Sequence, residues 1–219
     1  MIAPQEGCMA MNKLKFVPVI LAISLLTALL IGCGKSPAPT QQPKPNAPKT
    51  TMTQPENPVA PEKNPPGDIP DTQAFVTYKS TAGKYSVEAP EGWARSEQGA
   101  DVKFVDKFDG EMVTLSKSEA APTVSSIQQN QMSVLKQHGR AVEVQGVNNK
   151  LMPHGKTIVF VSYTSNSDPD PVTGKKVRLD NVTYYYYHQG TLATLTVWAP
   201  SGADNVDQWK RISESFRWF

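Results

Sequence analysis

The sequence predicts an α+β domain, built from antiparallel strands and two helices, behind a long amino-terminal extension without a packed core. From residue 72 onward, short runs rich in β-branched and aromatic residues are separated by turn residues, which is typical of strands joined by hairpins. Residues 123–137 and 204–216 instead repeat apolar residues at helical spacing. Residues 33–71 have neither pattern and are rich in proline, which favours an unpacked segment.

The first part of the chain, residues 1–32, has the layout of a secretory signal peptide. A basic stretch at residues 12–15 precedes an apolar run from 16 to 31, and this run is shorter than the roughly 20 residues that span a bilayer. Met9 and Met11 stand just before the basic stretch, so either is an alternative true start. An uncleaved signal anchor is the other interpretation, because apolar length separates the two cases poorly.

The apolar run ends in Leu-Ile-Gly-Cys at residues 30–33, which resembles the lipobox of bacterial lipoproteins. The resemblance implies cleavage between Gly32 and Cys33 and acylation of the Cys33 thiol, with palmitate as an expected acyl chain. It places the mature chain at the cell membrane, lipid-anchored and facing outside the cytoplasm, with the membrane as a partner through that lipid. The other cysteine, Cys8, precedes the cut, so no disulfide is expected. The letters Gly-Lys-Ser that follow lack the upstream glycine of a phosphate-binding loop, since Leu29 stands there.

The second part, residues 33–71, is expected to be the lipidated cysteine followed by a disordered linker. Its residues are mainly Pro, Lys, Thr, Gln, Asn and Glu, and its positive and negative charges cancel. Such a composition cannot bury enough apolar surface to offset the entropy lost on ordering. Fully extended at about 3.1 Å per residue, the linker would reach on the order of 115 Å.

The third part, residues 72–219, is long enough for a core of its own, and its charges nearly balance. Neither nucleic acid nor an anionic membrane surface is therefore expected as a partner of the domain. Two hairpins come first. Residues 74–80 pair with 85–90, and residues 102–108 pair with 111–118 across Asp109-Gly110.

The remaining elements are predicted from the spacing of apolar residues, which changes from the alternation of strands to helical spacing and back. The first helix is expected between Pro122 and the stop signal His138-Gly139. Four strands follow, at 141–147, 157–165, 177–188 and 191–200, the last two joined at Gln189-Gly190. The closing helix follows a cap at Asp204 or Asn205. The residues expected to be buried in the core include Trp93, Trp209 and Phe216.

Both ends of the domain resemble PsbP-like domains. The run "YSVEAPEGW" at 85–93 matches a strand that enters a Pro-x-Gly-Trp turn, and "WKRISESFRWF" at 209–219 matches a closing helix that finishes in a Ser-Phe pair, here Ser215 and Phe216. The resemblance implies an α/β/α sandwich around a central antiparallel sheet. This fold occurs in photosystem-associated extrinsic proteins and in bacterial lipoproteins of unassigned role. No site residue transfers with it, because the shared residues are structural.

Two clusters of polar or aromatic residues are candidate contacts for a ligand or partner. In the run Tyr184, Tyr185, Tyr186 and Tyr187 the phenols alternate between two faces of a strand, so one pair forms a platform if one face is exposed. The plainer interpretation is a packed sheet. Asp168 and Asp170 lie in a Pro-rich loop at 166–176, and their spacing occurs in calcium loops; the glycine and closing Glu of such loops are missing.

The sequence contains no recognised catalytic or metal motif, so no cofactor and no metal site is expected. The histidines, at 138, 154 and 188, are interpreted as surface or capping residues. The predicted function is therefore a membrane-anchored, non-catalytic PsbP-like module, not an enzyme, that binds or assembles with an envelope protein partner. The alternative is an envelope hydrolase whose site is assembled from distant residues.

Overall fold

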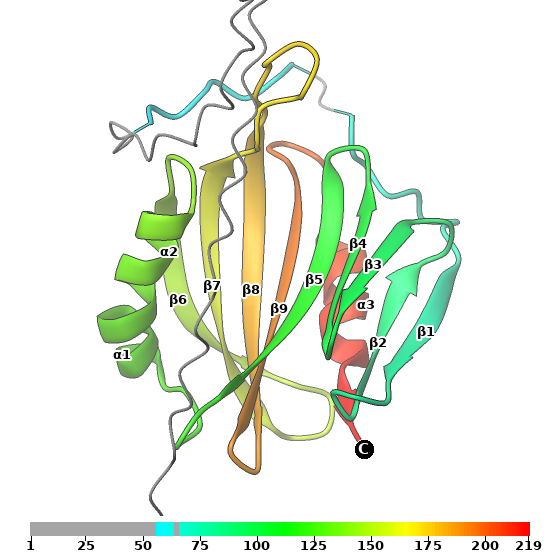
Figure 1. Cartoon of the computed structure of the whole chain (residues 1–219), viewed down its shortest axis with the longest axis vertical. Helices are drawn as coiled ribbons and strands as arrows, with labels where there is room; N and C mark the ends of the chain where they lie inside the picture. Colours follow the sequence, from blue (N-terminus) through cyan, green and yellow to red (C-terminus); the bar gives the residue numbers. More distant parts are fainter. Residues whose placement is uncertain (1–55, 64–65) are drawn as a thin grey trace, which may run out of the picture. The chain divides into compact units, whose positions relative to one another are not determined.

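The computed structural model describes residues 56–63 and 66–219, and the strands in this part of the chain form two antiparallel sheets (Figure 1). The larger sheet has seven strands in the order β3-β4-β5-β9-β8-β7-β6, and the smaller has the order β1-β2-β10. The strand bounds are β1 Phe75–Ser80, β2 Tyr85–Pro90, β3 Ala94–Gln98, β4 Asp101–Asp106, β5 Asp109–Lys117, β6 Glu143–Leu151, β7 Thr157–Asn166, β8 Arg178–His188, β9 Thr191–Pro200 and β10 Arg217–Trp218.

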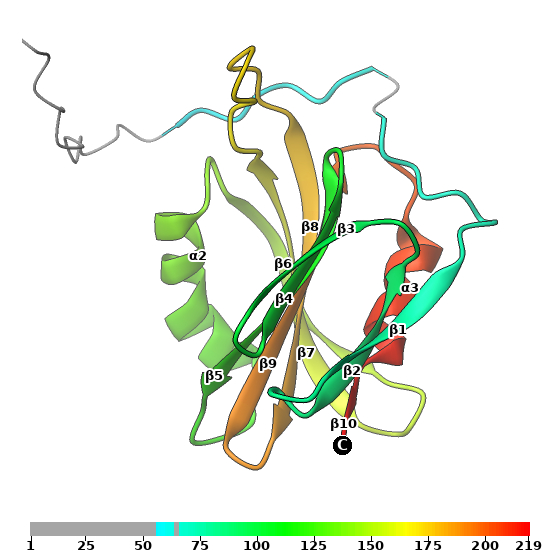
Figure 2. The same ribbon diagram turned by 45° about the vertical axis from the view of Figure 1, so that its right-hand side comes forward.

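Helices cover both faces of the larger sheet (Figure 2). On one face lie α1 (Val124–Ser126), the π-helical segment η1 (Ile127–Gln131) and α2 (Met132–His138), which follow one another directly. Ile127 packs there with Tyr185 in one core cluster. On the other face α3 (Val206–Ser215) packs, and its Ile212 shares a second cluster with Tyr184. The α+β class and the sandwich layering of the predicted fold are confirmed.

The first helical region begins and ends as the sequence indicates. Thr123 caps it reciprocally, since its Oγ1 accepts from the Ser126 backbone N at 3.1 Å and the Ser126 Oγ accepts from the Thr123 backbone N at 2.9 Å. Gly139 ends it after His138. Within the sheet, the hairpin at Gln189-Gly190 is also confirmed, with positive φ at both residues, as a tight turn requires.

The turn of the second hairpin is displaced from the predicted position. Asp109 and Gly110 belong to β5, and the chain reverses two residues earlier, where Lys107 has φ +50°. Gly110 is needed for a different reason. Its cross-strand partner is Trp198, and a Cβ at position 110 would lie 2.0 Å from the Trp198 ring.

Two strands were missed by the sequence analysis. Strand β3 is exposed along its whole length and has no apolar alternation for a pattern to detect. Strand β10 has two residues, too few for any periodicity. It nevertheless anchors the carboxyl-terminal end, because Trp218 pairs with Tyr85 of β2.

The closing helix packs on the core as predicted, but the side chain of its expected cap residue, Asn205, binds residues 67 and 69 instead of the helix. Phe216 is buried, while Trp93 and Trp209 are half-buried and packed against the same core cluster. The Asn205 side chain makes no cap hydrogen bond to α3. Its Oδ1 accepts from the Ile69 backbone N at 2.7 Å, and its Nδ2 donates to the Gly67 carbonyl at 2.7 Å.

The part of the predicted linker that the structure describes, residues 56–63 and 66–71, lies against the domain, which corrects the expectation of an unpacked segment there. Ile69 is 5% exposed, and Gln208 donates to its carbonyl at 3.0 Å. Glu56 pairs with Arg140 at 2.7 Å. From the sequence, the negative charges of the linker were expected to be offset by the linker's own lysines. In the structure, Glu56 and Glu62 form ion pairs with Arg140 and Lys175 of the domain.

The predicted signal segment and lipidation site, including Gly32 and Cys33, lie outside the described residues. Within residues 56–63 and 66–219, no helix combines the length and apolar character needed to cross a membrane.

Candidate functional site

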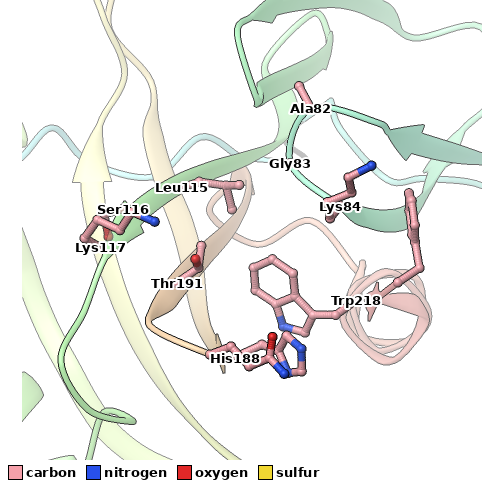
Figure 3. Close-up of a pocket in the computed structure, with 11 residues that line it drawn as sticks. Ala82, Gly83, Lys84, Leu115, Ser116, Lys117, His188, Thr191 and Trp218 are labelled. Atoms are coloured by element: carbon pink, nitrogen blue, oxygen red, sulfur yellow. The ribbon is translucent and has the colours of Figure 1, made fainter.

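Two adjacent cavities open at the end of the sheet where β8 turns into β9, and Trp218 forms part of both walls. Figure 3 shows the residues that line the smaller one. Their volumes are about 510 and 590 Å³, and they share His188, Trp218 and Phe219. We call this region the Trp218 site. The smaller cavity lies against the turn between β1 and β2 and the end of β5, and the larger against the start of β7.

Trp218 is held by backbone pairing and by aromatic packing. Residues 217 and 218 pair with β2, and the Phe219 backbone N donates to the Lys84 carbonyl at 3.0 Å. The Trp218 ring meets Phe216 edge-on, with centroids 5.4 Å apart. The His188 ring stacks on it with centroids 5.9 Å apart and an interplanar angle of 26°. The ring that lines both cavities is therefore fixed by the sheet and the core together.

The wall of the larger cavity includes Tyr185, Tyr186 and Tyr187 of β8. Tyr186 stacks on Phe216 with centroids 4.2 Å apart, and its hydroxyl donates to the Ser213 carbonyl at 2.6 Å. Burial raises the pKa of Tyr185 to about 12 and raises that of Tyr186 well above its ordinary value. These phenols therefore stay neutral at physiological pH and serve as packing and hydrogen-bonding groups.

The charged side chains that line the two cavities are all basic. Lys84 and Lys117 belong to the smaller cavity, and Lys156 and Arg217 to the larger. Apolar walls beside these cations suit a ligand that has both an apolar surface and a negative charge.

The histidines of the site are placed for binding contacts. His154 Nε2 lies 2.6 Å from Arg217 Nη2, and because arginine is a donor only, this imidazole nitrogen accepts. In the described part of the chain no group of three His, Cys, Asp or Glu residues is arranged to hold a metal ion. The Trp218 indole N–H is buried and has no hydrogen-bond partner among the described residues.

The tyrosine run lies in the interior of the sheet. Tyr184, Tyr185 and Tyr186 are buried and Tyr187 is half-buried, so neither alternate pair forms an exposed platform. Strand β8 is central, with β9 and β7 as neighbours, and helices cover both of its faces. Tyr184 does not line the cavities; Lys150 Nζ lies 5.3 Å from its ring centroid.

The aspartates lie at the opposite end of the sheet from the tyrosine end of β8, so the structure does not bring the two candidate clusters together. Asp170 Oδ1 accepts from the backbone N of Val172 at 3.1 Å and of Thr173 at 2.8 Å, which closes a local turn. These hydrogen bonds from Thr173 and Val172 lower the pKa of Asp170. Asp168 is exposed in the same loop.

The sequence analysis missed Trp218, Arg217 and Lys156 as site residues. Sequence spacing does not connect the last residues of the chain with the loop before β7. The one signal available was the Arg-Trp-Phe ending, whose two large aromatic residues lie beyond the closing helix and so need another surface to pack on.

Comparison with solved structures agrees with the fold described above. The domain is similar to the solution structure of cyanobacterial PsbP (CyanoP) from Synechocystis sp. PCC 6803, with a TM-score of 0.50 and 16% sequence identity. The match covers 70% of this chain and 98% of CyanoP. The domain therefore has a PsbP-like fold.

Two further solved structures match with lower scores. The Ran-binding protein Mog1p of Saccharomyces cerevisiae has a TM-score of 0.45 at 9% identity, covering 67% of this chain and 96% of Mog1p. A protein of unknown function from Pseudomonas aeruginosa has a TM-score of 0.40 at 12% identity, covering 64% of this chain and 94% of that protein. No family model and no curated protein matches the chain.

Proposed function

We propose that the protein is a bacterial lipoprotein, anchored outside the cytoplasm by lipid on Cys33, whose PsbP-like domain is a non-catalytic binding module for an envelope protein partner. The observation that carries the binding function is the Trp218 site. Two cavities that share one fixed tryptophan, lined by aromatic and basic side chains, have the form of a recognition site. The lipobox-like run at residues 30–33 supports the anchor.

The groups available at the Trp218 site support recognition. A partner segment with an apolar side chain and a carboxylate would find apolar surface against Phe219 and charge complementarity at Lys156 and Arg217. Aromatic residues and arginine are the residue types that contribute most to binding energy at protein interfaces.

Photo-crosslinking tests this function in the membrane, with the full-length chain. A crosslinking residue at position 219, where Phe219 is 59% exposed, should give one dominant protein adduct. The same residue at position 206, where Val206 is 71% exposed at the start of α3, is the matched control and should not give that adduct. Lys156→Gln combined with the probe at 219 should reduce the adduct severalfold. Equal adducts from both positions would contradict a partner site at Trp218.

Activity assays test the non-catalytic part of the proposal. Full-length protein in detergent should not turn over ester, peptide or glycoside reporters. If a reporter is hydrolysed, and replacing one of His138, His154 or His188 by Ala lowers the rate at least a hundredfold, the protein is an envelope hydrolase.

A further inference from the structure

The second feature that suggests binding lies at the end of the larger sheet opposite the Trp218 site. There the segment 56–63 runs beside the loop between β7 and β8 (Figure 1). This segment bears two carboxylates, Glu56 and Glu62, and its sequence is Glu-Asn-Pro-Val-Ala-Pro-Glu-Lys. We use the name segment receptor for the domain residues that it contacts, Arg140, Asn166, Lys175 and Lys176, together with Arg178, which hydrogen-bonds Asn166.

The receptor surrounds the Glu56 carboxylate with donors. Arg140 Nη2 lies 2.7 Å from Oε2, and Lys176 Nζ lies 2.7 Å from Oε1. Asn166 Nδ2 also donates to Oε1, at 3.0 Å. Burial acts to raise the pKa of Glu56, but the hydrogen bonds from Lys176 and Asn166 and the charge of Arg140 outweigh it and lower the pKa. Six residues further on, Glu62 pairs with Lys175.

The receptor also contacts the main chain of the segment. Asn166 Nδ2 donates to the Asn57 carbonyl at 2.9 Å, and Asn166 Oδ1 accepts from the Val59 backbone N at 3.0 Å. One side-chain amide therefore contacts two backbone groups that are two residues apart. Because all peptides have these main-chain groups, the Asn166 contact favours an extended chain of any sequence. Sequence preference therefore comes from the contacts of the receptor with the two glutamate carboxylates.

The central residues of the receptor are fixed by the sheet. Asn166 and Arg178 are each 4% exposed and form a cross-strand pair between β7 and β8. Arg178 Nη1 donates to Asn166 Oδ1 at 3.1 Å and to the Ala141 carbonyl at 2.7 Å, and its Nη2 pairs with Glu143 at 2.5 Å. The Asn166 amide, which faces the segment, is thus held in place by Arg178, and a preorganised group binds with less loss of entropy.

We propose that the segment receptor is a binding site for an extended acidic peptide, occupied in the resting chain by residues 56–63 and exchangeable with an acidic segment of a partner protein. The Arg140 and Lys176 side chains that pair with Glu56 are 35% and 30% exposed, so solvent screens both ion pairs and limits what each contributes to holding the segment. The Arg140 Nε–H is buried and has no acceptor among the described residues, so the segment leaves one donor of the receptor unused. Because the segment is tethered, its effective concentration keeps the site occupied until a partner competes.

A peptide of residues 56–63 provides the test, titrated into two forms of the full-length chain in detergent. In the variant Glu56→Gln/Glu62→Gln the chain's own segment 56–63 loses its ion pairs with the receptor and competes less well for it. The added peptide should therefore bind this variant at least tenfold more tightly than it binds the wild-type chain. Both substitutions fall on the segment itself, outside the sheet, so folding of the domain is not at risk. Binding should also weaken with added salt, because these ion pairs are partly exposed.

The controls separate the receptor from non-specific charge. A peptide with both Glu residues replaced by Gln should not bind, and Arg140→Gln/Lys176→Gln in the receptor should abolish binding of the acidic peptide. Lys103→Gln, an exposed lysine of β4, should leave binding unchanged. In amide exchange, the Val59 N–H should exchange faster in Glu56→Gln than in wild type. Absence of saturable binding to the double variant, or equal affinity for both forms of the chain, overturns the proposal. The test does not involve the Trp218 site, so its result is independent of the proposed function.

Discussion

Asp109 and Glu111 are two carboxyl groups on the same face of β5 that the fold buries without satisfying them. Both oxygens of Glu111 and one of Asp109 have no hydrogen-bond partner among the described residues. Burial, and then the charges of Asp106 and Asp68, raise the pKa of Asp109 to about 7, against a smaller opposing effect of Lys107. Burial alone raises the pKa of Glu111 well above its ordinary value.

These raised pKa values predict that stability falls as pH rises through neutrality. A carboxyl group whose pKa is higher in the folded than in the unfolded state binds its proton more tightly when the protein is folded. The protonated Asp109 therefore contributes fully to the free energy of unfolding below about pH 4, and this contribution is lost as pH rises through about 7. The thermal midpoint of Asp109→Asn relative to that of wild type should therefore rise by more than about 2 °C between pH 4 and pH 8. Asp170→Asn is the control, because the pKa of Asp170 is lowered and it does not titrate in this window. Parallel curves for wild type and Asp109→Asn would contradict this assignment.

At the scale of elements, α3 and β10 act as one unit that closes the domain. Phe216, between them, is 4% exposed and stacks on both Tyr186 and Tyr85, with centroid distances of 4.2 and 5.5 Å. Trp218 follows two residues later and pairs with β2. The same aromatic cluster therefore stabilises the core and fixes the wall of the Trp218 site.

Phe216→Ala should lower the free energy of unfolding by about 3 to 5 kcal/mol, because it removes a buried ring and leaves a cavity between the helix and the sheet. Denaturant unfolding followed by circular dichroism measures it. Val206→Ala, at a 71% exposed position on the same helix, should change stability by no more than about 0.5 kcal/mol. A loss below about 1 kcal/mol for Phe216→Ala would mean that the closing unit contributes little to the core.

For the whole molecule, the contacts of residues 56–71 predict where a protease first separates the extension from the domain. Since Glu56, Ile69 and Asp71 contact the domain, the stable fragment should begin at or before residue 56, and not near residue 72 as the composition indicates. Mass spectrometry of the fragment left by limited proteolysis gives its first residue. Glu56→Gln should move the cut toward the domain, and a fragment of wild-type protein that begins near 72 would show that these contacts do not protect the segment.

The lipid anchor is a second prediction at this scale. If Cys33 carries lipid, the protein should partition into the detergent phase of a Triton X-114 extract, and Cys33→Ser should move it to the aqueous phase, because at about 0.8 kcal/mol per buried methylene the acyl chains supply the membrane affinity. Cys8→Ser is the matched control and should change nothing, since Cys8 precedes the expected cleavage site. An unmodified Cys33 on membrane-bound protein, found by mass spectrometry, would contradict lipidation.

Local patterns were sufficient for the class of the domain. The hairpins around residues 81–84 and at Gln189-Gly190 depend on turn residues next to the strands they join, and the helix over 123–137 depends on spacing along one face. Such signals act within a few residues, so the sequence by itself determined the order of most elements and the antiparallel character of the sheet.

The tertiary structure alone decided which residues face one another across the sheet. Tyr185 changed from a candidate surface contact to a buried residue because helices cover both faces of β8, and a side-chain period of two does not show how many faces are covered. Trp218 became the centre of the candidate site because β10 pairs with β2, more than 120 residues earlier in the chain. The ion pair between Glu56 and Arg140 has the same physical cause. Contacts between segments that are distant in the sequence depend on how the layers of the fold pack, and the local spacing of apolar residues does not predict them.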